Sequence, residues 1–128
     1  GELKKVASGG ELSRIMLAIK KVMSENSQLP TIIFDEIDSG VSGEISNKMA
    51  HIMSQMSQQM QVITITHLPQ IAAKGNQHYK VYKEELNNTT TTSLKQLSED
   101  ERIVEIAEML SGKNISDSAL THARELLN

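Results

Sequence analysis

The stretch TIIFDEIDSGVSG, residues 31–43, decides how this chain folds. Its apolar run, residues 31–34, lacks the polar alternation of a half-buried strand, so it predicts a short strand that is buried on both faces. Asp35 and Glu36 end this strand abruptly, and Gly40 and Gly43 then bracket a turn. We therefore expect a buried strand whose polar end leads into a glycine-rich loop.

A second strand is expected downstream, over residues 61–66, and it ends at His67. Between the two strands, apolar residues at helical spacing predict an amphipathic helix: Ile45, Met49, Ile52, Met53 and Met56. Two strands joined through a helix imply a parallel pair with a right-handed crossover. Ligands bind such sheets beyond the carboxyl ends of the strands, which is where Asp35, Glu36 and His67 are expected to lie.

Upstream, the run VASGGELSR, residues 6–14, opens a predicted helix that begins at a Ser8 cap and ends near Asn26. The apolar positions of this helix are Leu12, Ile15, Met16, Ile19, Val22 and Met23. Ser8 and Glu11 have the spacing of a capping box. A helix N-terminus carrying Gly9 and Gly10 is equally an anion site, because no side chain obstructs its free amides. The run fits both uses.

The remainder of the chain predicts a β-hairpin followed by two helices. The two strands are expected at His78–Leu86 and Thr90–Leu97, around an Asn87-Asn88 turn. A capping box, residues 98–101, opens a helix that Gly112 stops, and Ser116 opens a last helix to Leu127. We expect an α/β chain organised as a first lobe, residues 1–76, and an appended hairpin with two helices, residues 77–128.

Composition limits the possible functions. The chain has 128 residues, seven Met, one Phe and no Trp, which predicts one domain with an aliphatic, Met-filled core. It has no Cys, so thiolate chemistry and disulfides are excluded. The formal net charge of -3 gives no overall basic field for nucleic acid. No run is long and apolar enough to cross a membrane, and a cytoplasmic location is expected.

The acid pair and the histidine have a functional interpretation and a plain one. As a Walker B pair, Asp35 would hold the water shell of Mg²⁺, and Glu36 would polarise the water that attacks a γ-phosphate. A neutral imidazole at His67 would donate to a phosphate oxygen and sense its presence. The plain alternatives are solvated turn acids and an exposed histidine. The loop with Ser42 and Gly43 either crosses to a partner subunit or simply caps the next helix.

Two other chemistries find little support. The four histidines, His51, His67, His78 and His122, show no metal-ligand spacing. A hydrolase triad would need a serine within a G-x-S-x-G turn, and Ser39 does not lie in that pattern.

Taken together and in this order, the motifs resemble those of an ABC-type ATPase head. SGGE, residues 8–11, resembles the ABC signature; residues 31–36 resemble Walker B; residues 41–43 lie where the D-loop falls; and His67 resembles the switch histidine. The wording of SGGELSRIMLAIK, FDEIDSGVSG and THLPQIAA is similar to the RecN family, bacterial DNA-repair relatives of the SMC proteins. The likeness extends to ERIVEIAEMLSG and the closing ALTHARELLN, so it covers nearly the whole chain.

The resemblance implies more than this chain contains. No G-x-x-x-x-G-K-[ST] loop is present, because Gly112-Lys113 is followed by Asn114 and lacks the earlier glycine. In that family the Walker A half lies at the N-terminal end of a long protein, beyond a coiled coil. The chain is thus expected to be the C-terminal half of a head, which by itself neither binds ATP tightly nor hydrolyses it.

For the intact protein, the resemblance implies an ATPase of DNA recombination and double-strand break repair, cytoplasmic and nucleoid-associated, using ATP and Mg²⁺. Its partners would be the Walker A half, a second head in a homodimer, and DNA. Ser8, Gly9, Gly10 and Glu11 would meet the γ-phosphate held by the other subunit, with Ser42 and Gly43 beside it. The alternatives are a head of another SMC-like or RecF-like protein, and a dimerisation module without catalysis.

Overall fold

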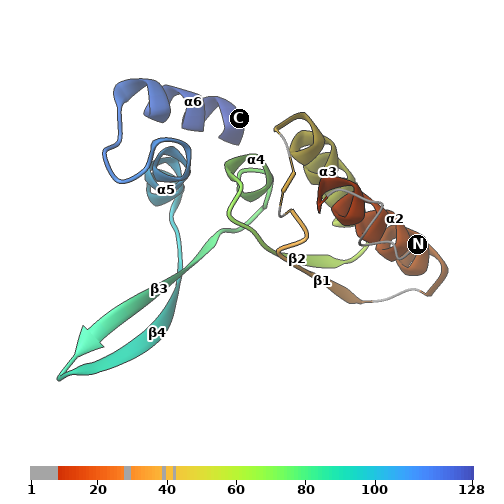
Figure 1. Ribbon diagram of the computed structural model, residues 1–128, viewed down its shortest axis with the longest axis horizontal. Coiled ribbons are helices and arrows are strands. Elements are labelled where there is room, and N and C mark those ends of the chain that lie inside the picture. The colour runs from red at the N-terminus through yellow and green to blue at the C-terminus, as the bar shows by residue number, and fades with distance from the viewer. Residues whose placement is uncertain (1–8, 28–29, 39, 42) are drawn as a thin grey trace. The chain divides into compact units, whose positions relative to one another are not determined.

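The computed structural model describes residues 9–27, 30–38, 40–41 and 43–128 (Figure 1). The chain divides into two compact units, Gly1–Lys74 and Gly75–Asn128. The first contains α2 (Gly9–Ser27), β1 (Thr31–Asp35), α3 (Gly43–Met56), β2 (Gln61–Ile65) and α4 (Pro69–Ala72). The second contains β3 (Tyr79–Leu86), β4 (Thr89–Gln96), α5 (Glu99–Ser111) and α6 (Asp117–Leu127). None of the helices in the described part is both long and apolar enough to span a bilayer.

In the first unit, β1 and β2 form a parallel pair, with α3 as the connection between them (Figure 1). The register runs from Thr31 opposite Gln61 to Asp35 opposite Ile65. Parallel strands need a crossover rather than a tight turn, and the helical spacing of residues 45–56 supplies it. The predicted α/β fold and the order of its elements are confirmed.

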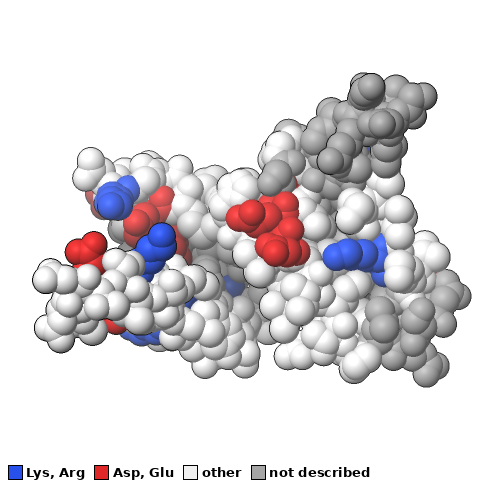
Figure 2. All heavy atoms as spheres, turned by 60° about the horizontal axis from the view of Figure 1, so that its bottom comes forward, with Lys and Arg blue, Asp and Glu red and all other residues white. Residues whose placement is uncertain are grey.

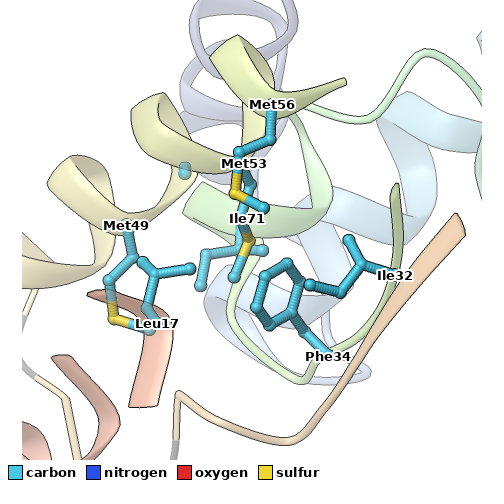
Figure 3. Close-up of a cluster of buried hydrophobic side chains, with 8 residues drawn as sticks. Leu17, Ile32, Phe34, Met49, Met53, Met56 and Ile71 are labelled. Atoms are coloured by element: carbon cyan, nitrogen blue, oxygen red, sulfur yellow. The ribbon is translucent and has the colours of Figure 1, made fainter. Parts of the chain in front are cut away.

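The core of this unit lies where β1 meets the helices (Figure 3). Ile32 and Phe34 point from β1 toward Met53 of α3 and Ile71 of α4, and all four side chains are buried. Lys20 of α2 adds a polar tie, because its Nζ lies 5.1 Å from the centre of the Phe34 ring and donates to the Ile33 carbonyl at 3.0 Å. A cation over an aromatic face is attracted by the ring quadrupole. The Met-filled aliphatic core is as predicted.

The expectation that β1 is buried on both faces is wrong. Successive residues of a strand point to opposite faces, and only the face of Ile32 and Phe34 is covered. On the other face Ile33 is 54% exposed, and its partner in the register, Ile63, is 43% exposed. The continuous apolar run therefore describes a strand with two apolar faces, of which the described residues cover one.

The apolar stripe of α2 is also not a core face in this chain. Leu17 is buried among the described side chains of the helix, and it packs in the core. The residues with the predicted helical spacing are instead exposed: Ile15, Met16, Ile19, Val22 and Met23. Leu17 packs in the core and Lys20 contacts β1, so the exposed apolar stripe lies on another side of the helix. The predicted start of this helix at Ser8 falls outside the described residues.

In the second unit, β3 and β4 form the predicted antiparallel hairpin. Leu86 pairs with Thr89, which leaves the two residues Asn87 and Asn88 in the turn with φ of 52° and 62°. Two-residue hairpin turns of type I′ need positive φ at both central positions, and Asn tolerates this region better than most residues. The polar dipeptide therefore sets the turn.

Both helices of the second unit begin as their sequences predict. Ser98 Oγ accepts from the Glu101 amide at 3.2 Å, and Glu101 Oε1 accepts from the Ser98 amide at 3.0 Å, so the capping box is complete. Gly112 ends α5 at a φ of 82°. Ser116 Oγ caps α6 by accepting from the Ala119 amide at 3.1 Å.

Two ion pairs join the hairpin to α5. Lys80 of β3 lies 2.7 Å from Glu105, and Lys95 of β4 lies 2.5 Å from Glu101. The hydrogen bond from Lys95, followed by that from the Ser98 amide, lowers the pKa of Glu101 to about 2. These exposed pairs fix the orientation of the hairpin on the helix, because Lys80 and Lys95 are opposite each other in the register.

Candidate active site

The acid pair lies at the carboxyl end of β1. Asp35 is the last residue of the strand, and Glu36 follows it, with both side chains exposed. The amide of Glu36 donates to the carbonyl of Ile65 at 2.9 Å and so continues the parallel ladder by one residue. Backbone hydrogen bonds therefore hold the residues that carry the two carboxylates at the edge of the sheet. The sequence pattern predicted this position.

Glu36 has an unusual backbone conformation. Its φ is +52°, a region that residues other than glycine enter rarely. Such a conformation costs on the order of 1–3 kcal/mol and persists where the surrounding structure fixes it. Here the hydrogen bond to Ile65 and the loop that follows supply the constraint. Strained residues cluster at functional sites, so this conformation makes Glu36 a stronger candidate for a functional residue.

His67 reaches the same edge from β2. It lies two residues beyond Ile65, the strand's last residue, and its side chain is 61% exposed. Its Nδ1 lies 3.9 Å from Oδ1 of Asp38. The structure thus brings Asp35, Glu36 and His67 to one edge of the sheet, as expected for ligand-binding residues of a parallel α/β sheet.

Asp38 is a residue that the sequence motifs did not single out. Its side chain is 1% exposed, although it carries a carboxylate. Oδ2 accepts a hydrogen bond from the Thr66 hydroxyl, and Thr66 Oγ1 in turn accepts from the Leu68 amide at 3.0 Å. The sequence shows Asp38 only as one more acid, next to Ile37 in the loop that follows the acid pair. An acid in such a loop is usually solvated, so nothing in the sequence indicated that Asp38 would be buried.

The remaining predicted site residues begin helices or fall outside the described residues. Gly9, Gly10 and Glu11 lie in the first turn of α2, and Gly43 is the first residue of α3. Ser8 and Ser42 are outside the described part of the chain. A Cβ placed on Gly43 would meet no atom within 4 Å, so the local fold leaves open space at this position.

The donor set suits a magnesium nucleotide only in part. Carboxylates such as Asp35 bind Mg²⁺ well when substrate phosphates and waters complete the octahedron. Among the described residues, no group of three or more His, Asp or Glu side chains is arranged to hold a metal. The sequence contains no phosphate-binding loop.

The basic side chains of the described residues can be followed on the face that Figure 2 shows. On the face that Figure 2 shows, the Lys and Arg atoms of the described residues stand in several small groups, apart from one another. Nucleic-acid interfaces usually gather basic side chains into one patch or stripe. The net charge of -3 agrees with this distribution.

Solved structures share this fold. An SMC ATPase from work on ATP-driven dimerisation and DNA-stimulated activation superposes with a TM-score of 0.66 at 20% identity, covering 84% of this chain and 64% of that chain. The Smc head domain with a coiled coil and joint derived from Pyrococcus yayanosii superposes with a TM-score of 0.67 at 21% identity, covering 83% of this chain and 20% of that one. No family model matches the chain.

Curated relatives match over nearly the whole sequence. DNA repair protein RecN of Bacillus subtilis is 47% identical over 125 residues, which are 98% of this chain and 22% of that protein. DNA repair protein RecN of Haemophilus influenzae is 44% identical over 126 residues, 98% of this chain and 23% of that protein. The chain thus spans less than a quarter of the length of these relatives. With its SMC-head fold and this identity along its length, the chain belongs to the RecN family.

Proposed function

We propose that this chain is the C-terminal half of a RecN-like ATPase head that acts in DNA double-strand break repair and recombination. The observation that carries the proposal is the parallel pair β1 and β2, which sets Asp35, Glu36 and His67 at one edge of a sheet. Similarity to proteins named DNA repair protein RecN supports the repair role.

Each residue at this edge has a role in the proposal. Asp35 holds Mg²⁺ through its water shell, and Glu36 orients and polarises the attacking water. His67 contacts the terminal phosphate. When bound, Mg-ATP would supply the scissile phosphoryl group and a cation that neutralises its charge. The strained φ of Glu36 favours this catalytic role over a dimerisation module that has lost hydrolysis.

The proposed head acts as a homodimer, with the signature motif working in trans. Ser8, Gly9, Gly10 and Glu11 would complete the site of the opposite subunit, since a helix N-terminus with free amides suits an anion. Gly43 and its neighbour Ser42 would lie against the mate. Work on ATP-driven dimerisation of an SMC ATPase that shares this fold supports the arrangement.

The Walker A half of the same protein is the proposed intramolecular partner. The uncovered face of the sheet supports this, because Ile33, Ile63 and Ile65 are all large apolar side chains left exposed. The exposed stripe on α2 supports it as well. DNA, a cytoplasmic and nucleoid-associated location, and the cofactors ATP and Mg²⁺ belong to this proposal for the whole protein.

The test is made in the full-length protein with Glu36→Gln. This change keeps the size of the side chain and its backbone hydrogen bond but removes the charge that orients water. ATP hydrolysis should fall by roughly 10² or more, while ATP binding, measured by titration calorimetry, is retained. Glu44→Gln is the matched control, because Glu44 is an exposed acid of α3 whose partner is Lys48 at 4.0 Å. A Glu36→Gln protein that hydrolyses ATP at the parent rate would refute the assignment.

A further inference from the structure

Asp38 is a buried carboxylate with one hydrogen-bonded oxygen and one for which the described residues supply no donor. Oδ2 accepts from Thr66. Oδ1 is buried and has no hydrogen-bond partner among the described residues. Leaving a buried charged acceptor unsatisfied is costly, which is why buried polar atoms are nearly always paired. The group facing Oδ1 is the imidazole of His67, with Nδ1 at 3.9 Å.

We propose that Asp38 is a positioning residue for His67: Oδ1 accepts the proton of Nδ1, and Nε2 is thereby the nitrogen presented at the edge of the sheet. The inference rests on the proposed function for its consequence at the phosphate, but the contact itself does not. His67 is largely exposed, so solvent rather than packed side chains surrounds most of the ring, and the hydrogen bond requires the ring to move toward Oδ1. Hydrogen bonds of catalytic groups are often long before the substrate binds.

The surroundings of Asp38 determine which of its oxygens is left for the histidine. The Leu68 amide donates to Thr66 Oγ1 at 3.0 Å, so the hydroxyl proton of Thr66 is directed to Asp38 Oδ2. The Val41 amide donates to the Asp38 carbonyl at 3.2 Å and holds the loop backbone. The carboxylate is therefore fixed before a ligand arrives, with Oδ1 toward Nδ1.

This arrangement has a chemical consequence for His67. In the neutral ring one nitrogen donates and the other accepts, so a proton on Nδ1 leaves Nε2 as an acceptor. A ring that donates to a phosphate oxygen through Nε2 while Nδ1 donates to Asp38 therefore carries a proton on both nitrogens. Carboxylates that hold the tautomer of a catalytic histidine act in this way.

Nitrogen NMR of the whole 128-residue chain, with ¹⁵N-labelled histidine, tests the contact directly. Protonated and unprotonated ring nitrogens have well-separated shifts, and the exposed His122 in the same spectrum is an internal reference. We expect neutral His67 to carry its proton on Nδ1, whereas free histidine favours Nε2. A wild-type His67 with its proton on Nε2 overturns the proposal, with no variant needed.

Asp38→Asn should reverse the tautomer. The amide keeps an oxygen to accept from Thr66 and turns its NH₂ group toward His67, so Nδ1 must accept and the proton moves to Nε2. Asp117→Asn, a change in the first turn of α6, is the control and should leave the His67 shifts unchanged. A folded Asp38→Asn chain whose His67 still carries its proton on Nδ1 counts against Asp38 as the acceptor.

In the full-length protein, Asp38→Asn should lower kcat roughly tenfold to a hundredfold, a range typical of partners that orient a functional histidine, with little change in KM. A purely structural role would alter stability without this split. If the tautomer is as expected but the parent protein hydrolyses no ATP, the proposed function fails and the positioning stands. If the parent hydrolyses ATP and His67 carries its proton on Nε2, the positioning fails alone.

Discussion

The amide of Glu36 donates to the carbonyl oxygen of Ile65 at 2.9 Å. This bond extends the β1–β2 ladder beyond its last register pair, Asp35 and Ile65. It fixes the backbone from which the Glu36 side chain projects, and it does not involve the carboxylate. A Glu36→Gln variant keeps this amide, so the bond to Ile65 remains available to it.

Mixed dimers test whether the signature acts in trans. Full-length protein with Glu36→Gln in one subunit and Ser8→Arg in the other should recover a substantial part of the ATPase rate, although each mutant homodimer is nearly inactive. The reason is that both lesions then fall in one composite site, and the second site is whole. Ser8→Arg as a lost cap alone would cost about 1 kcal/mol of stability and spare hydrolysis.

The control for that experiment is a linked dimer with both lesions in one subunit. If the sites are shared, this dimer has one lesion in each site and stays inactive. Heterodimers that form and show no recovered activity would count against a signature in trans or against independent turnover of one site. The linked dimer distinguishes these two explanations.

Gly43→Ala separates a structural from an interfacial role for the loop after the acid pair. Gly43 is the first residue of α3, and a Cβ there meets nothing within 4 Å. The change should leave the 128-residue chain as stable or stabilise it by about 0.4–1 kcal/mol, because it restricts the unfolded chain. If the loop lies against a second head, the same change should slow hydrolysis in the full-length protein. Thermal unfolding and ATPase rates measure both effects.

Gly112→Ala is the matched comparison within the same chain. A Cβ at Gly112 also meets nothing within 4 Å, but its φ is +82°. A residue with a Cβ is strained there, so we expect destabilisation by about 1–2 kcal/mol and no specific effect on hydrolysis. Equal effects of the two substitutions on stability would contradict the backbone argument.

The uncovered face of the sheet predicts self-association of this chain by itself. Ile33 and Ile63 are partners in the register and are both exposed, and unpaired strand edges with apolar side chains promote association. Changing both to Thr should shift sedimentation of concentrated samples toward monomer while the fold is kept, because neither side chain packs in the core. Phe34→Thr, on the buried face, should instead unfold the unit. A parent chain that is monomeric at millimolar concentration would argue against an absent neighbour.

His78 predicts a pH dependence of stability in the second unit. Burial is the largest cause of a lowered pKa at His78, followed by the charge of Arg102. Glu105 opposes these effects by raising the pKa, and Lys80 adds a smaller lowering effect. The unfolded chain then binds a proton at a higher pH than the folded chain does. The second unit therefore keeps its full stability above the ordinary histidine pKa of about 6.5. It loses stability as the pH falls from there toward the lower pKa of His78 in the folded chain.

Urea unfolding at a series of pH values from about 8 to 5 measures this loss, with His78→Gln as the reference because Gln does not titrate. The parent should lose more stability than the variant on acidification. Parallel curves would show that His78 is not the responsible group. The other three histidines are present in both proteins, so any contribution from them cancels in the difference.

Local sequence signals predicted most of the elements. The Asn87-Asn88 dipeptide specifies a two-residue turn, and the Ser98–Glu101 box specifies a helix start, because the groups that satisfy the backbone lie within four residues of one another. The placement of Asp35, Glu36 and His67 at one edge was also predictable. It follows from two strands joined through a helix, whose carboxyl ends lie together in a parallel sheet.

The sequence by itself determined the parallel pair, the hairpin, the caps and the identity of the acids at the strand end, because periodicity and capping are short-range properties. Only the tertiary structure decided which face of each apolar element is covered. Hydrophobic spacing shows that a side chain avoids water but not which neighbour covers it, so Ile33 and the α2 stripe, expected inside, are exposed. Tertiary structure also decided that Asp38 is buried against Thr66 and near His67. Thr66 lies just beyond β2, 28 residues from Asp38 in the chain, and no local pattern encodes that approach.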